Sequence, residues 1–142
     1  MGFLAQYDGN SFVDLTQELK YSLRTNDFQS VNAIAWNGQS WILGGGPPIA
    51  QLNEGHAWIA TYTPSGNISD LSSTLPRYVS AREQTSSILT ITPEGGLWIL
   101  GGYSGARGTL FAYENGYLAD YSNLVSDMTY VNWVSNLQVL AS

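Results

Sequence analysis

The sequence predicts an all-β fold assembled from short, repeated four-stranded sheets. One observation is a repeated phrase: residues 41–45 and 98–102 both read WILGG, and each leads to a further strand that carries a tyrosine. A second is the spacing of turn residues: Asn-Gly, Ser-Gly and Gly-Gly pairs, which suit tight turns, separate short apolar and β-branched runs. A third is that no stretch sustains a helical apolar period. The best helix candidate, residues 16–23, has room for one or two turns.

The repeat keeps a nearly constant register. Tyr62 and Tyr113 are 51 residues apart, and Asp70 and Asp120 are 50 residues apart. In a first copy, Asp14 lies 56 residues before Asp70. A period near 50 with several short strands per unit is typical of propeller-type repeats, in which each unit forms one blade.

About three blades are predicted, in a single partial domain over residues 1–142. The chain starts halfway through the first copy, at residues 3–15, and residues 131–142 supply the opening half of that copy. There, Val131-Asn132 repeats Val31-Asn32 at an offset of 100 residues. The predicted blades comprise residues 2–27 together with 128–142, residues 28–77, and residues 78–127.

Four strands are expected in each complete blade, because turn residues bound each apolar run. In the second blade the predicted strands are residues 31–36, 40–44, 57–62 and 67–71. In the third blade they are residues 87–92, 97–100, 109–113 and 117–120.

The Gly-Gly pair at the end of the second strand, the tyrosine that follows it and the spacing resemble kelch-like β-propeller repeats. The resemblance covers nearly the whole chain. It departs from the kelch pattern in the fourth strand, where Phe12, Ile68 and Leu118 stand in place of a tryptophan. The resemblance implies a β-propeller of four-stranded blades.

A blade buries its broad faces only against neighbouring blades, and a ring usually needs four to eight of them. Three blades leave two apolar faces uncovered, so we expect ring closure by association. Two chains that pair residues 131–142 of one copy with residues 3–15 of the other close a six-bladed homodimer. A three-chain ring of nine blades is the alternative. The expected partner is therefore the chain itself.

Composition narrows the function. Only 11% of residues are charged, the formal net charge is −6, and the five Lys and Arg residues are scattered, which argues against nucleic acid and anionic membrane surfaces. No apolar run approaches membrane-spanning length, and no secretory leader is expected. The chain has no cysteine, so disulfides and thiolate metal sites are excluded. We expect no cofactor and no metal. The sequence does not indicate the cellular compartment of the protein.

Asp14, Asp70 and Asp120 recur at one position, just after the apolar residue of the fourth strand. One interpretation is a ring of carboxylates that binds cations or sugar hydroxyls. The other is a structural role, in which each carboxylate accepts backbone N–H bonds as the strand turns out of the blade. Recurrence in every repeat favours the structural role.

The five tryptophans suggest either core packing or carbohydrate stacking. Trp41 and Trp98 are equivalent in the repeat, and we expect both to pack between blades. Trp36 and Trp133 lie near the ends of first strands, so they are the better ligand candidates, although core packing is favoured for both.

Loops that gather at one mouth of the channel are a second candidate site, an inference that rests on the resemblance. The residues expected there are charged or polar; those predicted to bind a ligand are Glu54, His56, Arg82, Arg107 and Arg24. His56 is the only histidine, which makes a metal site or a catalytic base there a poor prediction. An ordinary solvated rim is the competing interpretation.

Three functions remain open. We expect a non-enzymatic β-propeller scaffold or binding module that assembles from half rings, without a specific ligand. A carbohydrate-binding lectin is the alternative, suggested by many aromatic, Gly, Asn and Ser residues and few charges. A propeller enzyme needs a cluster of acid, base or metal-binding residues, and the sequence indicates none. The chain could also be an engineered or split fragment of a larger propeller protein.

Overall fold

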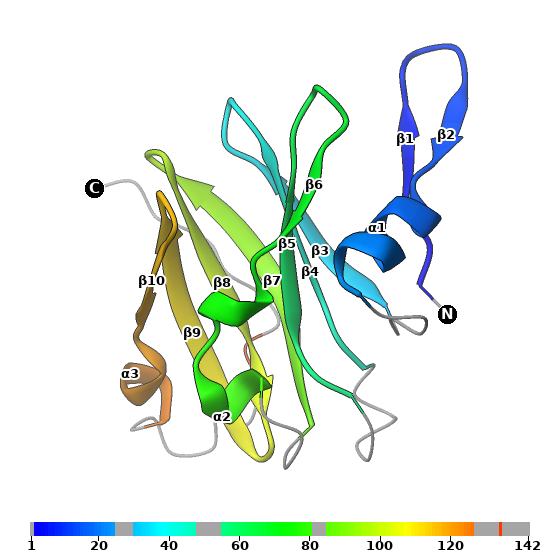
Figure 1. Cartoon of the computed structure of the whole chain (residues 1–142). Coiled ribbons are helices and arrows are strands. Elements are labelled where there is room, and N and C mark those ends of the chain that lie inside the picture. The colour runs from blue at the N-terminus through cyan, green and yellow to red at the C-terminus, as the bar shows by residue number, and fades with distance from the viewer. Residues whose placement is uncertain (1, 25–29, 48–54, 81–84, 127–133, 135–142) are drawn as a thin grey trace.

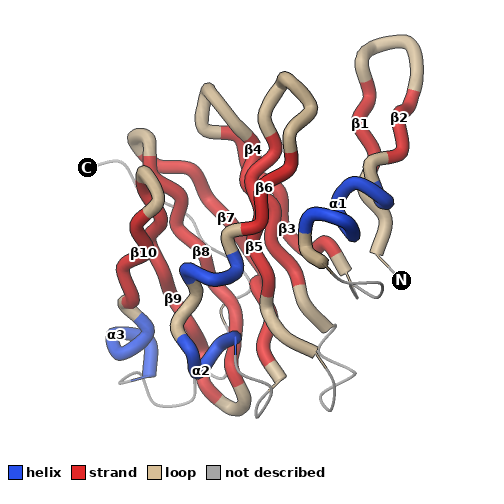
Figure 2. The backbone as a smooth tube through the Cα atoms, in the orientation of Figure 1, coloured by secondary structure: helices blue, strands red, loops and turns tan. Residues whose placement is uncertain are grey.

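The computed structural model describes residues 2–24, 30–47, 55–80, 85–126 and 134. These residues are mostly β-strands in three antiparallel sheets, which confirms the all-β prediction (Figures 1 and 2). Within this part of the chain, no helix has the length and apolar character needed to span a membrane.

The two large sheets are meanders in which each strand pairs with the next. The central sheet consists of β3 (Val31–Trp36), β4 (Trp41–Gly45), β5 (Trp58–Tyr62) and β6 (Ile68–Asp70). The distal sheet consists of β7 (Ser86–Glu94), β8 (Leu97–Ser104), β9 (Arg107–Glu114) and β10 (Tyr117–Asp120). All eight predicted strands are present, and β7, β8 and β9 are longer than predicted.

The third sheet is a two-stranded hairpin at the amino terminus, the N-terminal hairpin, made of β1 (Ala5–Tyr7) and β2 (Phe12–Asp14). The helix predicted at residues 16–23 is present as α1 (Thr16–Ser22). Three shorter helical turns were not predicted: η1 (Ser72–Thr74), α2 (Arg77–Ser80) and α3 (Ser122–Ser126).

Tight turns at one end of the sheets follow from the Asn-Gly and Gly-Gly pairs. Asn115 and Gly116 have φ values of 49° and 86°, and Gly95 and Gly96 have 54° and 99°. Positive φ at both central residues is the geometry of a type I′ turn, whose twist matches that of the flanking strands. The hairpins that these turns close point the same way (Figure 1).

The sheets stack in a row, with the central sheet between the N-terminal hairpin and the distal sheet (Figure 1). Apolar residues between the central and distal sheets form one core, which includes Ile42, Ile59, Ile88, Leu100 and Phe111. A second core lies on the other face of the central sheet and joins it to the hairpin and α1 through Leu4, Leu15, Leu19, Leu43 and Tyr62.

The two Gly-Gly pairs have a shared structural cause. Opposite each pair the neighbouring first strand carries a β-bulge, between Val31 and Ala33 in the central sheet and between Ile88 and Thr90 in the distal sheet. A β-carbon at Gly45 would collide with the Ser30 carbonyl oxygen. The equivalent Gly102 meets the Ser87 carbonyl in the same way, so the second glycine accommodates the bulge.

The first glycine of each pair serves a neighbouring layer. A β-carbon at Gly44 would lie 2.7 Å from Ile88 Cγ2 and 3.1 Å from Ile91 Cδ1, both on β7 of the distal sheet. The missing side chain therefore lets the two sheets approach closely. This close approach explains why the sheets pack face to face at the repeated motif.

Candidate functional site

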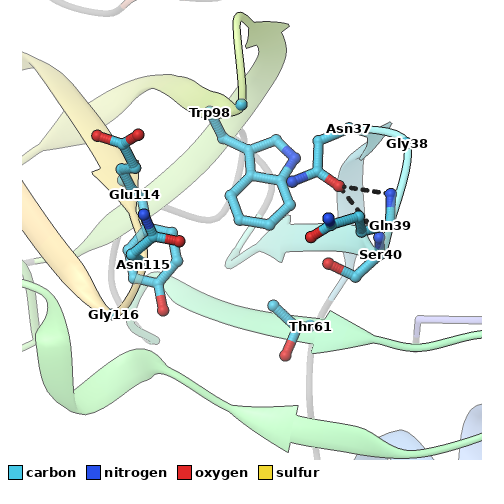
Figure 3. Close-up of a pocket in the computed structure, with 11 residues that line it drawn as sticks. Asn37, Gly38, Gln39, Ser40, Thr61, Trp98, Glu114, Asn115 and Gly116 are labelled. Atoms are coloured by element: carbon cyan, nitrogen blue, oxygen red, sulfur yellow. Dashed lines mark hydrogen bonds between the residues drawn. The ribbon is translucent and has the colours of Figure 1, made fainter.

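A polar cleft of about 480 Å³ opens between the central and distal sheets, at the end where the tight turns lie. The β3–β4 turn and one strand of the central sheet form one side, and the distal sheet forms the other (Figure 3). Its lining residues are Asn37, Gly38, Gln39, Ser40, Thr61, Gly96, Trp98, Tyr113, Glu114, Asn115 and Gly116.

Aromatic rings form the distal wall of the cleft. Trp98 and Tyr113 face each other across β8 and β9, with their ring centroids 5.7 Å apart. Trp98 is buried, and its indole N–H has no hydrogen-bond partner among the described residues. Burial raises the pKa of the Tyr113 hydroxyl, and a hydrogen bond from the Gly116 N–H opposes that rise. Tyr113 is buried as well, so only a small part of either ring borders the cleft.

Amide and hydroxyl groups form the opposite side. The Asn37 side-chain oxygen accepts hydrogen bonds from the backbone N–H groups of Gln39 and Ser40, each at 3.0 Å, which fixes the turn. Asn37 then presents its side-chain NH₂ group near Trp98, and Thr61 reaches in from β5 (Figure 3). Asn and Thr side chains supply the donors and acceptors that orient a polar ligand.

Charge is nearly absent from this cleft. Glu114 is the only charged side chain among the described residues that line it, and it is exposed. The described part of the chain holds no cluster of three His, Cys, Asp or Glu residues that could bind a metal ion. Among these residues the polarity of the cleft therefore comes mainly from amide and hydroxyl groups.

A second cavity, the apolar groove, has a volume of about 410 Å³ and separates the N-terminal hairpin from the central sheet. It is lined by Leu4, Ala5, Gln6, Tyr7, Leu15, Ile34, Trp41, Leu43 and Tyr62. Trp41 and Tyr62 pair across β4 and β5 as Trp98 and Tyr113 do across β8 and β9. The Tyr62 hydroxyl donates to Gln6 Oε1 at 2.5 Å, which ties β1 to the central sheet.

Among the described residues, the ligand candidates predicted from the loops do not line the polar cleft. Arg107 is the exposed first residue of β9, at the opposite end of the distal sheet (Figure 1). His56 is half-buried just before β5, and Arg24 is exposed after α1. Glu54, Arg82 and Trp133 lie outside the described residues.

The predicted tryptophans differ in their surroundings. Trp36 ends β3 and packs against Trp41, with ring centroids 5.2 Å apart. Trp98 is buried between the two sheets, whereas its equivalent Trp41 is exposed in the groove.

Each repeated aspartate caps the turn that follows its strand. Asp14, Asp70 and Asp120 each accept a hydrogen bond from the backbone N–H two residues later, at 2.8, 2.8 and 2.9 Å. A helical turn begins at that later residue in all three repeats. These bonds match the structural interpretation, which the substitution proposed below tests through stability.

Asp120, at the end of the distal sheet, has an additional hydrogen-bond partner on α2. The Tyr78 hydroxyl donates to Asp120 Oδ2 at 2.6 Å and to Ser122 Oγ at 3.1 Å. Partial burial, together with the hydrogen bond to Asp120, raises the pKa of Tyr78 to about 12. This contact fastens α2 to the end of β10 and lies beside Arg107, in a pocket of about 100 Å³.

Sequence reasoning missed the polar cleft. The Asn37-Gly38 and Asn115-Gly116 pairs form turns, as the sequence predicts. These two turns are 78 residues apart, and they line one cleft only because the two sheets stack. The signal that could have indicated the cleft is the recurrence of a Trp in the second strand and a Tyr in the third.

Comparison with known proteins adds no relative, since no family model, no curated protein and no solved structure matches the chain. The kelch-like resemblance therefore stays a prediction.

Proposed function

We propose that this chain is a non-enzymatic binding module on a β-propeller frame, and that the polar cleft between neighbouring sheets binds a neutral, polyhydroxylated ligand, with saccharides as the chemical class. The observation that carries this proposal is the cleft itself, an aromatic wall facing amide and hydroxyl groups with little charge. Sugars use both kinds of contact, because their C–H faces pack on rings and their hydroxyls need donors and acceptors.

The propeller frame is supported by how the sheets repeat. Each large sheet is a four-stranded meander with a bulged first strand and a Gly-Gly pair at the same register. The first glycine admits side chains of the following layer, so the same packing can be repeated from sheet to sheet. A ring is the closed form of such a row.

A binding experiment tests the ligand class. Saturation-transfer NMR with glucose, galactose, mannose and N-acetylglucosamine should show transfer from the protein to at least one of these sugars. A Thr61→Trp substitution fills the cleft from β5 and should abolish that signal, whereas Ser65→Trp in the exposed β5–β6 turn should preserve it. No transfer to any of the four sugars, or transfer that both variants retain, removes the cleft as a saccharide site.

A second candidate function is an assembly scaffold without a small ligand. The apolar groove favours it, because Ile34 and Trp41 expose large apolar side chains there.

A further inference from the structure

Equivalent residues of the two large sheets differ sharply in exposure. Trp98 is 5% exposed and Ile91 is 9% exposed, because the central sheet covers them. Their counterparts 57 residues earlier, Trp41 and Ile34, are 39% and 48% exposed. The difference lies in what covers the face, since both pairs occupy the same strand positions within their sheets.

The N-terminal hairpin covers only part of the outer face of the central sheet. Tyr62 on the third strand of the central sheet is buried, because β1 lies over it and supplies Gln6. Ile34 and Trp41 lie on the first and second strands, where the hairpin does not reach. β1 pairs only with β2 among the described strands, so its other edge is open on that side. Two strands beside β1 would complete a four-stranded sheet over both exposed residues.

One described residue near the carboxyl end, Val134, indicates where such a strand would lie. The Val134 N–H donates to the Gly102 carbonyl at 2.9 Å, and a β-carbon at Gly101 would lie 2.5 Å from Val134 Cγ1. Against Gly44, the corresponding contacts come from two residues of the distal sheet, Ile88 through Cγ2 and Cβ and Ile91 through Cδ1. In the repeat, Val134 also corresponds to Ile91, because Val131-Asn132 corresponds to Val31-Asn32 and Ile34 to Ile91. Val134 thus sits where the first strand of a next sheet belongs.

We propose that residues 131–142 of a second copy of this chain dock in the apolar groove as the two missing strands beside β1. One strand contains Val134, which contacts the distal sheet of its own copy. The other contains residues 138–142, whose letters QVLAS align with WILGG and place Ala141 and Ser142 at the positions of Gly44 and Gly45. Both residues carry a β-carbon that those glycines lack, so the docked strand must lie farther from its neighbours than β4 does. By the same equivalence, Ala141 lies over Val31 and Ile34 of the other copy, so each copy completes the other across a two-fold axis.

A hydrogen bond predicts how the docked strands are held. Asn32 reaches from β3 to the next sheet, and its side-chain NH₂ donates to Ser87 Oγ at 2.8 Å and to the Ile88 carbonyl at 3.0 Å. Asn132 corresponds to Asn32, and Ser30 and Val31 correspond to Ser87 and Ile88. We therefore expect Asn132 of one copy to donate to Ser30 and Val31 of the other.

The position of Val134 argues against the chain's own carboxyl segment as the occupant of the groove. Val134 lies on the distal sheet's Gly101, whose partner face is turned away from the central sheet, whereas the groove lies on the hairpin side of the central sheet. Both large sheets therefore stand between Val134 and its own groove. Packed sheets lie about 10 Å apart, so a strand containing Val134 cannot occupy both places at once. This argument is independent of the ligand proposed for the polar cleft.

An engineered disulfide tests the docking directly, because the chain has no cysteine of its own. The template pair is Gly44 and Ile88, where a β-carbon at Gly44 would lie 3.1 Å from Ile88 Cβ, somewhat closer than the roughly 3.5–4.5 Å that a disulfide bridges, so a small outward shift brings the equivalent pair into range. The equivalent pair between copies is Ala141 and Val31. A Val31→Cys/Ala141→Cys double variant should run mostly as a covalent dimer without reductant, with a 31–141 cross-link by mass spectrometry.

Val31→Cys/Leu140→Cys is the matched control, because a shift of one residue turns the side chain to the other face of the strand. It should form far less covalent dimer. A 31–141 bond within one chain, equal cross-linking in both variants, or a covalent ladder beyond the dimer overturns the proposal. A measurement on the unmodified chain does not depend on whether a variant folds. Sedimentation equilibrium should give twice the mass of one chain. A folded monomer at micromolar concentration overturns the docking.

Discussion

The central and distal sheets contain the same WILGG strand, the same bulge and the same paired Trp and Tyr, yet one aromatic pair is enclosed and the other borders an open groove. The motif, the bulge and the Trp–Tyr pair, which depend on contacts within a sheet, are present in both sheets. Features that depend on a neighbouring layer differ. The comparison teaches that the repeat encodes the sheet, and that each neighbour decides whether its apolar face is a core or a surface.

Removing the two equivalent tryptophans should give the largest effect and the largest contrast. Trp98→Ala empties a buried site and should lower the free energy of unfolding by about 3–5 kcal/mol. Trp41→Ala removes a side chain that is 39% exposed and should cost about 1–2 kcal/mol when the protein is dilute. Urea unfolding followed by circular dichroism measures both values.

Protein concentration sharpens this contrast. If a second copy covers the groove, the cost of Trp41→Ala at micromolar concentration should approach that of Trp98→Ala, and it should fall only on dilution well below the micromolar range, because association stabilises only the covered form. Equal costs for both variants at every concentration would break the comparison between the two sheets.

Alanine at the second glycine of each pair should show the opposite behaviour, a similar cost in both sheets. Gly45→Ala and Gly102→Ala each drive a β-carbon against a backbone carbonyl of the same sheet, which cannot rotate away as a side chain can. We expect each to lose about 2–3 kcal/mol, within the usual range for overpacking. Thermal melts of the two variants should shift together, and a shift confined to one sheet contradicts the shared role of the bulge.

The sequence predicted more of the sheets than of their surroundings. Strands were recoverable because turn residues bound them and alternation sets their faces, and β3 and β10 begin and end as expected. The helical turns η1, α2 and α3 were missed because three to five residues are too few to show a helical period. The polar cleft and the exposure of Trp41 were missed because both depend on which layer stacks on which, and no local pattern encodes that.

The smallest expected effect is the pH dependence of the aspartate caps, for which Asp14 offers the clearest case. Hydrogen bonds from the Thr16 hydroxyl and the Thr16 N–H hold the pKa of Asp14 below its usual value. A depressed pKa in the folded state contributes stability above the unfolded pKa, and that contribution is lost as the pH falls through the folded one.

Asp14→Asn keeps a side-chain oxygen to accept the Thr16 N–H but cannot ionise, so its melting temperature should lie slightly below that of the unmodified chain at pH 7. The two melting temperatures should converge as the pH falls through the lowered pKa of Asp14, where the aspartate becomes protonated as well. Asp70→Asn, at the equivalent position in the central sheet, is the comparison that separates the cap from the N-terminal hairpin. A gap between Asp14→Asn and the unmodified chain that stays constant from pH 7 to pH 3 would show that ionisation of Asp14 contributes nothing, and that the cap acts through its hydrogen-bond geometry alone.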